Sequence, residues 1–444
     1  MSEWPIKSIG ELAAFHRGIT WASSQETEKP EPGCVPVLRI PNVQERLNTT
    51  SILFLRGISA EKRRQFAATK TWLLMVGSNG NPNRVGDCVR ITQDTDYLFA
   101  SFLVGVEPKS DEDVDPCFLH YLLRSDSVRK AVSDSIKGTT GLRNISISHL
   151  AAHEVRCPPP AEQRKIARIL TTLDNLIEKT ETLIAKYQAI KQGMMHDLFT
   201  RGVDAQGHLR PPQAEAPDLY KQSELGWIPK EWEETTVGNE LIGIDAGKSP
   251  DCPDTPAPRG EWGVLKVSAV QPDGFLSHEN KIITNHTWAN PVYEVHDGDL
   301  LISRSNTYQL VGLVCLVRSP QPRLMLCDKT LRLRFDPRRA MADFMFWLLQ
   351  EPHARRQIEI HATGTSGSMK NISQPVVRSL RLALPPVTEQ ERINCRIQAI
   401  QKKMKAEQLT VEKMRHEKIG LMQDLLTGKV RVNADETEEV AAYV

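Results

Sequence analysis

Two stretches of the chain, PPPAEQRKI at 158–166 and PPVTEQERI at 385–393, decide how the sequence is organised. Each opens a segment of about forty residues in which apolar side chains recur every three or four positions, the spacing of one helix face. The first segment covers 159–200 and the second 386–427. We therefore expect two long amphipathic helices, each introduced by prolines, with Pro160 at the first position of the first helix.

The two stretches belong to an internal repeat. They begin 227 residues apart (158 and 385), and other matches lie within two residues of this offset: VLRIPNVQ at 37–44 with VLKVSAVQ at 264–271, GTTGLRNIS at 138–146 with GTSGSMKNIS at 364–373, and KQGMMHDLFT at 191–200 with KIGLMQDLLT at 418–427. Collinear matches at nearly one offset indicate a duplicated sequence. Between these matches the two copies differ in sequence. They therefore share the order and spacing of their segments but not most of their residues.

Each copy begins with short runs rich in β-branched residues, separated by turn residues, which predict strands. A helical pattern follows, over Asp115 to Ile136 in the first copy and Ala340 to Ile360 in the second. The sequence thus predicts an α/β fold class with two domains of mixed α/β type, at 1–158 and 231–385. Residues 201–230, which contain four prolines, are expected to form a connecting loop, and 428–444 a C-terminal tail.

A helix of this length extends about 60 Å, more than the width of a domain of this size, so it must project and needs a partner. The other copy supplies one. The first helix leads to the second domain and the other helix follows that domain, so we expect an antiparallel coiled coil with pseudo-two-fold symmetry and a domain at each end. Thr388 and Glu391 stand in capping-box spacing at the start of the second helix, and Gly202 and Gly428 predict the two helix ends.

The composition excludes several classes of protein. Of 444 residues, 40% are hydrophobic and 25% charged, as in globular proteins, and no apolar run approaches the roughly 18 residues that cross a bilayer. No secretory signal is evident, so we expect a cytoplasmic protein without membrane contact. The eight cysteines show no metal-ligand spacing, which disfavours zinc and disulfides. The formal net charge is +1, so any affinity for nucleic acid must come from local patches.

The sequence carries little sign of catalysis. Asp273, Glu279 and Lys281 superficially resemble the carboxylates and lysine of metal-dependent nucleases, but five intervening residues hardly allow two strands, and the first copy has no equivalent. A non-catalytic chain without a metal site is therefore favoured. A stand-alone nuclease and a coiled-coil adaptor that binds only proteins remain as alternatives.

The chain has two α/β domains, each followed by a long helix that begins with PPPAEQRKI or PPVTEQERI. In this arrangement it resembles the specificity subunits of type I DNA restriction-modification systems over essentially its whole length. GTTGLRNIS, GTSGSMKNIS and SELGWIPKEWE at 223–233 support the resemblance. It implies that each domain is a target-recognition domain for one half of an interrupted double-stranded DNA sequence, and that the helices set the spacing. It also implies two modification subunits that methylate adenine N6 with S-adenosylmethionine, and restriction subunits that use ATP with Mg. This chain would then bind no cofactor and would not itself be an enzyme.

Base recognition needs hydrogen-bond donors and acceptors on adaptable backbone, and phosphate contact needs Lys, Arg or backbone amides. Polar loops at equivalent places in the two copies are the candidates. In the first copy they contain Arg17, Thr20, Ser78, Asn79, Asn81, Arg84, Lys137, Thr139, Thr140, Arg143 and Asn144. In the second they contain Lys248, Ser249, Ser303, Arg304, Ser305, Asn306, Thr307, Thr365, Ser366, Ser368, Lys370 and Asn371.

An equally weighted alternative is that the glycines of these loops merely form turns, which Asn144 and Asn371 cap. Arg84 and Arg304 have simple solvation as their alternative role. Arg355 and Arg356 lie in the second helical pattern and are expected on its solvated face.

Overall fold

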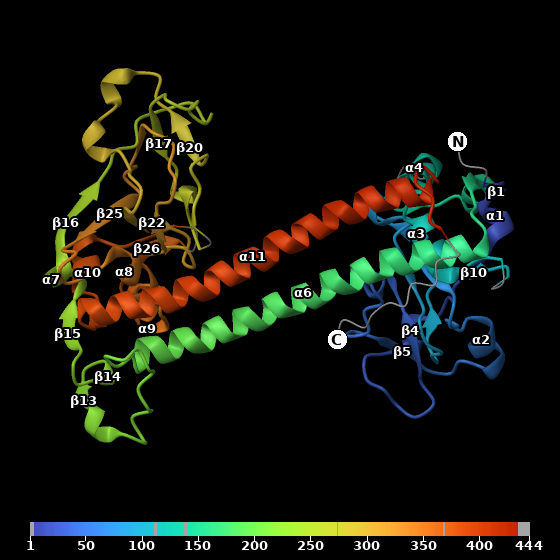
Figure 1. The fold of residues 1–444 in the computed structure, drawn as a ribbon, viewed down its shortest axis with the longest axis horizontal. Helices are drawn as coiled ribbons and strands as arrows, with labels where there is room; N and C mark the ends of the chain where they lie inside the picture. Colours follow the sequence, from blue (N-terminus) through green and yellow to red (C-terminus); the bar gives the residue numbers. More distant parts are fainter. Residues whose placement is uncertain (1–3, 111–112, 137–140, 273, 367–368, 434–444) are drawn as a thin grey trace. The chain divides into compact units, whose positions relative to one another are not determined.

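The computed structural model describes residues 4–110, 113–136, 141–272, 274–366 and 369–433. The chain forms two compact units: unit 1 consists of Met1–Leu183 with Glu407–Val444, and unit 2 of Ile184–Ala406. Each unit contains one α/β domain, and the two long helices α6 (Pro160–Thr200) and α11 (Val387–Leu426) contribute residues to both units (Figure 1). The expected α/β fold with two long helices is confirmed.

Unit 1 is built on a four-stranded antiparallel sheet in the order β2-β10-β6-β8, beside a second sheet in the order β3-β5-β4-β9, whose strands β4 and β9 are parallel. Two short pairs, β1 with β12 and β7 with β11, complete it. Its strands are β1 (Ile6–Ser8), β2 (Ala13–Arg17), β3 (Glu26–Thr27), β4 (Val35–Leu38), β5 (Leu53–Leu55), β6 (Leu73–Val76), β7 (Ser78–Asn79), β8 (Cys88–Arg90), β9 (Leu98–Phe99), β10 (Leu103–Pro108), β11 (Arg143–Asn144) and β12 (Glu154–Arg156). Its shorter helices are α1 (Ile9–Leu12), α2 (Ala60–Gln65), α3 (Pro116–Leu123), α4 (Asp126–Ser135) and α5 (Ile147–Ala152).

Unit 2 repeats this plan, with a four-stranded antiparallel sheet in the order β16-β25-β21-β23 and a smaller sheet, β20-β17-β24, whose strands β17 and β24 are parallel. Its strands are β13 (Tyr220–Ser223), β14 (Gly226–Pro229), β15 (Glu233–Thr236), β16 (Leu241–Ala246), β17 (Gly263–Leu265), β18 (Val270–Gln271), β19 (Gly274–Phe275), β20 (Asn280–Ile282), β21 (Leu300–Ser303), β22 (Ser305–Asn306), β23 (Val314–Leu316), β24 (Leu324–Met325), β25 (Thr330–Phe335), β26 (Thr363–Ser366), β27 (Met369–Asn371) and β28 (Arg381–Leu384). Its shorter helices are α7 (Val237–Glu240), α8 (Ala342–Leu348), α9 (Pro352–His361) and α10 (Gln374–Ser379).

The single helix expected in each α/β domain is wrong, because each domain has two helices there, α3 with α4 and α8 with α9. In unit 1 the break lies at Ser125, whose hydroxyl donates to the carbonyl of Leu122 at 2.7 Å. In unit 2 it lies before Pro352, which begins α9 and has no backbone N–H to continue the preceding helix. The apolar pattern continues across both breaks, and it therefore hides them.

The long helices begin and end at similar signals. α6 begins at Pro160 as expected, but α11 begins at Val387, so Thr388 lies inside the first turn and not at the expected cap. The carbonyl of Pro386 accepts instead from the amides of Glu389 (2.8 Å) and Gln390 (3.0 Å). Both helices end two residues before a glycine with positive φ, Gly202 (62°) and Gly428 (73°), as expected.

Both units contain the start of one long helix and the end of the other. In unit 1 the core contains Ile166 of α6 and Leu425 of α11. In unit 2 it contains Leu198 of α6 and Ile393 of α11. The helices are antiparallel within unit 1, because Asp174 pairs with Lys418 while Glu181, further along α6, pairs with the earlier Arg415.

The segment at 201–230 is more ordered than the expected connecting loop, since it contains the hairpin of β13 and β14. Tyr220 of this hairpin is buried, and its hydroxyl donates to the carbonyl of Pro211 at 2.6 Å. Among the described residues, no helix is both long and apolar enough to cross a membrane.

Candidate nucleic-acid interface

In unit 1 three strand ends meet at one edge of the central sheet. Arg17 at the end of β2 lies opposite Val104 near the start of β10, and Val76 at the end of β6 lies opposite Leu103. The antiparallel order therefore places the loop after β2, the turn before β10 and strand β7 next to one another. We call this surface edge 1, formed by residues 17–20, 78–81, 101–102 and 141–144.

Strand β7 pairs with β11 and so joins two of the loops predicted from the sequence. Asn79 lies opposite Arg143, and Ser78 lies opposite Asn144. Asn79 Oδ1 accepts from the amide of Asn81 at 2.8 Å, which fixes the turn that follows. The side chains of Asn81, Arg143 and Asn144 are exposed, whereas Ser78 is buried. Polar groups from two distant segments are thus held beside each other on an ordered ladder.

Unit 2 has the corresponding surface, which we call edge 2, formed by residues 247–249, 304–308, 328–329 and 369–371. Strand β22 follows the end of β21 and pairs with β27, so that Ser305 lies opposite Asn371 and Asn306 opposite Lys370. The hydroxyl of Ser305 donates to Asn371 Oδ1, and Asn306 Oδ1 accepts from the amide of Thr307 at 2.9 Å. Lys370 Nζ donates to the carbonyl of Gly364 at 2.7 Å. The duplication therefore repeats the ladder as well as the strands.

A glycine begins the first loop of each edge for the same steric reason. A Cβ at Gly18 would overlap the carbonyl oxygens of Phe99 and Ala100, and a Cβ at Gly247 would overlap that of Leu326. Only glycine allows this approach of two backbones. The close approach fixes where the exposed side chains of Arg17, Thr20, Lys248 and Ser249 leave the domain.

The turn before β10 in unit 1 and the turn before β25 in unit 2 carry residues that the sequence did not single out. The carbonyl of Phe102 accepts from the amides of Gly77 (2.9 Å) and Ser78 (3.2 Å). At the equivalent place the carbonyl of Lys329 accepts from Arg304 (2.7 Å) and Ser305 (3.4 Å). Phe102 is 47% exposed and Lys329 is also exposed. No sequence motif marks this turn, and only the match of the two copies at one offset could have suggested it.

Some predicted residues are engaged inside their own domain. Arg84 pairs with Asp87 at 2.9 Å and donates to the carbonyl of Val43 at 2.6 Å. Ser303 is fully buried and donates to the carbonyl of Leu310 at 2.5 Å. The hydroxyl of Ser249 donates to Asp328. These contacts give Arg84 and Ser303 a structural role. Arg304, in contrast, is exposed on the surface of edge 2.

Arg355 is not on the solvated face expected for it, although Arg356 is exposed. Arg355 donates to the carbonyl of Val311 at 2.9 Å, and Arg129 makes the equivalent bond to the carbonyl of Val85 at 3.1 Å. Both arginines reach from a helix to the loop after the ladder strand. They hold the backbone that carries the edge, a contact between residues too distant in sequence for periodicity to reveal.

Several predicted residues cannot be placed. Lys137, Thr139, Thr140 and Ser368 lie outside the described residues, as does Asp273 of the nuclease alternative, and nothing is described of the side chains of Thr365 and Ser366. Of that alternative, Glu279 accepts from the hydroxyl of Ser268 at 2.6 Å. Within the described ranges no three His, Cys, Asp or Glu side chains are grouped so that they could hold a metal ion.

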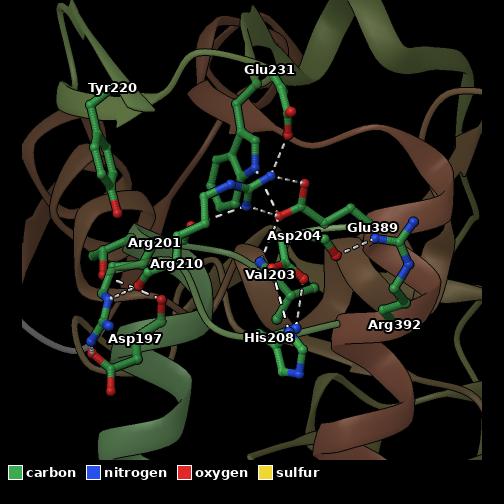
Figure 2. Close-up of polar contacts among 12 residues, drawn as sticks. Asp197, Arg201, Val203, Asp204, His208, Arg210, Tyr220, Glu231, Glu389 and Arg392 are labelled. Carbon is green, nitrogen blue, oxygen red and sulfur yellow. Dashed lines mark hydrogen bonds and ion pairs between the residues drawn. The ribbon is translucent and has the colours of Figure 1, made fainter. Parts of the chain in front are cut away.

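Within PPVTEQERI, Glu389 is the centre of a buried junction at the start of α11 (Figure 2). Glu389 accepts from Arg210 Nη1 at 2.6 Å, from the indole of Trp232 at 3.1 Å and from the amide of Val203 at 2.8 Å. The side chains of Arg210 and Glu389 are only 6% and 4% exposed. Burial lowers the pKa of Arg210, but the hydrogen bond and charge of Glu389 raise it, and the net shift is upward. The guanidinium of Arg210 therefore remains charged although it is buried.

PPPAEQRKI forms the same junction at the start of α6. Glu162 accepts from the indole of Trp4 at 3.2 Å and pairs with Arg431, which follows α11. Gln163 and Gln390 are equivalent as well, because each donates to the carbonyl of a proline before its helix, Pro158 and Pro385, at 2.9 Å. The Glu of each EQ pair thus ties its helix start to the segment that follows the other helix, and the Gln ties it to the prolines before the helix.

Comparisons with known proteins agree with this architecture. Residues 1–188 match a family described as the type I restriction modification DNA specificity domain. The chain is 36% identical over 167 residues to the type I restriction enzyme EcoEI specificity subunit of Escherichia coli, an alignment that covers 37% of this chain and 28% of that subunit. It is 24% identical over 433 residues to the putative type I restriction enzyme MjaX specificity subunit of Methanocaldococcus jannaschii, which covers 97% of this chain and 94% of that one.

Solved structures show the same fold. The type I restriction-modification S subunit from M. genitalium superposes with a TM-score of 0.56 at 14% identity, over 96% of each chain. A chain from a structural study of type I restriction-modification complex assembly and conformational transition superposes with a TM-score of 0.53 at 14% identity, over 96% of this chain and 98% of that one. These relatives support neither the adaptor nor the nuclease alternative.

Proposed function

The chain belongs to the family of type I restriction-modification specificity subunits, and from this we propose that each of its α/β domains recognises one half of an interrupted DNA target. The observation that carries the proposal is the repeated edge. In each unit a ladder of Ser and Asn faces a second strand that ends in a basic residue and Asn. Asn suits adenine, and Arg or Lys suits guanine or phosphate. Two such edges in one chain fit a target with two halves.

The basic residues favour DNA as the ligand. Edge 1 carries Arg17 and Arg143, and edge 2 carries Lys248, Arg304, Lys329 and Lys370. These lie on a chain whose formal net charge is only +1, so the positive charge is local. Phosphate contacts would position each domain, and the amides of Asn79 and Asn306 would contact bases.

We propose that α6 and α11 set the spacer between the two halves. α6 has 41 residues and α11 has 40, which corresponds to about 60 Å of helix. The proposed partners are two modification subunits, which would carry S-adenosylmethionine and methylate adenine N6 on each strand, and restriction subunits that use ATP with Mg. We place this assembly in the cytoplasm, and this chain would supply recognition and no catalytic group.

The experiment that tests the proposal is modified-base sequencing of the host genome with and without this gene. We expect one interrupted motif that contains N6-methyladenine to lose its methylation when the gene is deleted. Expression of the chain from a plasmid should restore it. If every modified motif persists while the modification subunits are produced and active, the proposed function is wrong.

The spacer role has its own test. Four residues inserted into each of α6 and α11 add about 6 Å, or one turn, to each helix. The same genome sequencing should then find a longer spacer between two unchanged half-sites. A control insertion of four residues between Ala214 and Glu215, outside both helices, should leave the spacer as it is. An unchanged spacer in a folded, active helix variant would refute the role of the helices.

A further inference from the structure

A large apolar side chain is exposed at an equivalent place beside each ladder, with Leu142 directly before β11 and Met369 at the start of β27. Leu142 is 48% exposed and Met369 is 50% exposed. They correspond under the internal repeat, because each precedes a basic residue and an asparagine: Leu142 is followed by Arg143 and Asn144, and Met369 by Lys370 and Asn371. The duplicated domains differ over much of their length, yet this order of apolar, basic and amide side chains recurs in both.

Neither side chain has a packing role that explains it. Among the described residues, Leu142 and Met369 belong to no hydrophobic cluster of their domain. Covering an exposed apolar side chain with a ligand lowers the free energy, because the apolar surface leaves water. A single exposed apolar residue is ordinary on a protein surface. Two at equivalent positions of the internal repeat, each next to a ladder, indicate a shared use.

The strand geometry shows what accompanies each apolar group. Side chains alternate along a strand, so Met369 shares a face of β27 with Asn371, and Lys370 points to the other face. The bond from the Ser305 hydroxyl to Asn371 Oδ1 fixes Asn371 toward β22. In β11, Asn144 lies opposite Ser78 in the same way. In unit 2 an apolar group and an amide thus lie along one face of β27 with a cation beside them, and in unit 1 Leu142 directly precedes β11.

These groups match the chemistry of a base edge better than that of a protein partner. In the major groove, thymine presents a C5-methyl group, which is the apolar feature of the four bases, and adenine presents the donor and acceptor that an amide recognises. The flanking charges of edge 2, Lys248, Arg304 and Lys329, complement phosphates. Because Leu142 and Met369 are exposed, these two side chains can approach a groove without displacing the core.

We propose that Leu142 and Met369 each contact the methyl group of a thymine, one in each half of the DNA target. The inference rests on the proposed function and deepens it by naming a base feature that both domains recognise. It implies that the two half-sites have a thymine at corresponding positions. Leu142 and Met369 would then contribute to base specificity, while Arg143 and Lys370 would contact the phosphate backbone of the DNA.

The test uses the complex of this chain with its modification subunits and duplexes of its target, in which single thymines are replaced by deoxyuridine, which lacks only the methyl group. For the wild-type complex we expect about a four-fold loss of affinity at one thymine of each half-site, the value of one buried methyl group. Leu142→Ala should abolish this loss in the first half-site alone, and Met369→Ala in the second alone. The exchanges Leu142→Met and Met369→Leu keep an apolar contact and should preserve the sensitivity.

Ile6→Ala and Ile360→Ala remove exposed apolar side chains elsewhere in unit 1 and unit 2 and serve as matched controls that leave the sensitivity intact. If no deoxyuridine substitution weakens wild-type binding to a duplex that it otherwise recognises, the inference is wrong while the proposed function stands. The inference also fails if Leu142→Ala or Met369→Ala weakens assembly with the modification subunits in the absence of DNA. A wild-type complex that recognises no DNA sequence would instead contradict the proposed function.

Discussion

The two helix junctions are alike, whereas the two sheet edges have diverged. Glu162 with Trp4 and Glu389 with Trp232 form the same contact at equivalent positions. At the edges, by contrast, Phe102 stands where the second copy has Lys329. Removing the partners of a buried carboxylate lowers the stability of the fold strongly, whereas substitution of an exposed side chain changes it little. The junctions therefore maintain the shared framework of the two copies, and the edges are free to differ from one unit to the other.

The largest expected effect breaks the likeness of the two junctions. Glu389→Ala leaves the buried Arg210 without its main partner and should lower the free energy of unfolding by about 3–5 kcal/mol. Glu162→Ala should cost about 1–2 kcal/mol, because Arg431 is 47% exposed and water can solvate it. Urea unfolding followed by tryptophan fluorescence measures both, since Trp4 and Trp232 lie in the two junctions. Equal losses would show that burial of the arginine does not set the difference.

A smaller effect tests whether the two edges act separately. Arg304→Ala removes an exposed cation from edge 2 and should weaken recognition of the second half-site by about 1–3 kcal/mol if the guanidinium contacts a base edge. Affinity should be compared between duplexes altered in one half-site at a time. Arg356→Ala, an exposed arginine on α9, is the matched control and should change neither half. An equal effect of Arg304→Ala on both halves would contradict the assignment.

The smallest expected effect concerns the salt dependence of DNA affinity, in which Lys329 and Phe102 should differ because only Lys329 is charged. If Lys329 contacts a phosphate, Lys329→Ala should reduce the slope of log affinity against log salt by about 0.9, because one fewer counterion is released. Phe102→Ala carries no charge change and should leave this slope unaltered. Titration of the assembled complex at several salt concentrations separates the two. A similar change of slope for both variants would show that the turn acts through structure and not through charge.

The sequence predicted the elements whose signals are local. The long helices followed from apolar periodicity, and their ends followed from Gly202 and Gly428. The breaks at Ser125 and Pro352 were missed, because the same helix face stays buried on both sides. Thr388 misled for another reason, because α11 follows two prolines and begins two residues earlier than a cap at Thr388 would place it.

The candidate site was harder to predict, because its geometry depends on contacts between distant residues. The loops around Asn79 and Arg143 were found from their polarity, but their pairing in one ladder depends on strand order. Phe102 and Lys329 carry no motif, and Arg355 was placed on the wrong face because its partner, the carbonyl of Val311, lies on another element. Local patterns thus give the elements, and the tertiary fold decides which of their side chains meet.

The most direct test of the account exchanges residues 231–385 for the corresponding domain of a specificity subunit whose target is known and different. Genome-wide sequencing of N6-methyladenine then gives the motif of the chimera. We predict that the second half-site becomes that of the donor, while the first half-site and the spacer stay as in the parent chain. A change in the first half-site, or a change in both halves together, would contradict the claim that each α/β domain recognises its own half of the target.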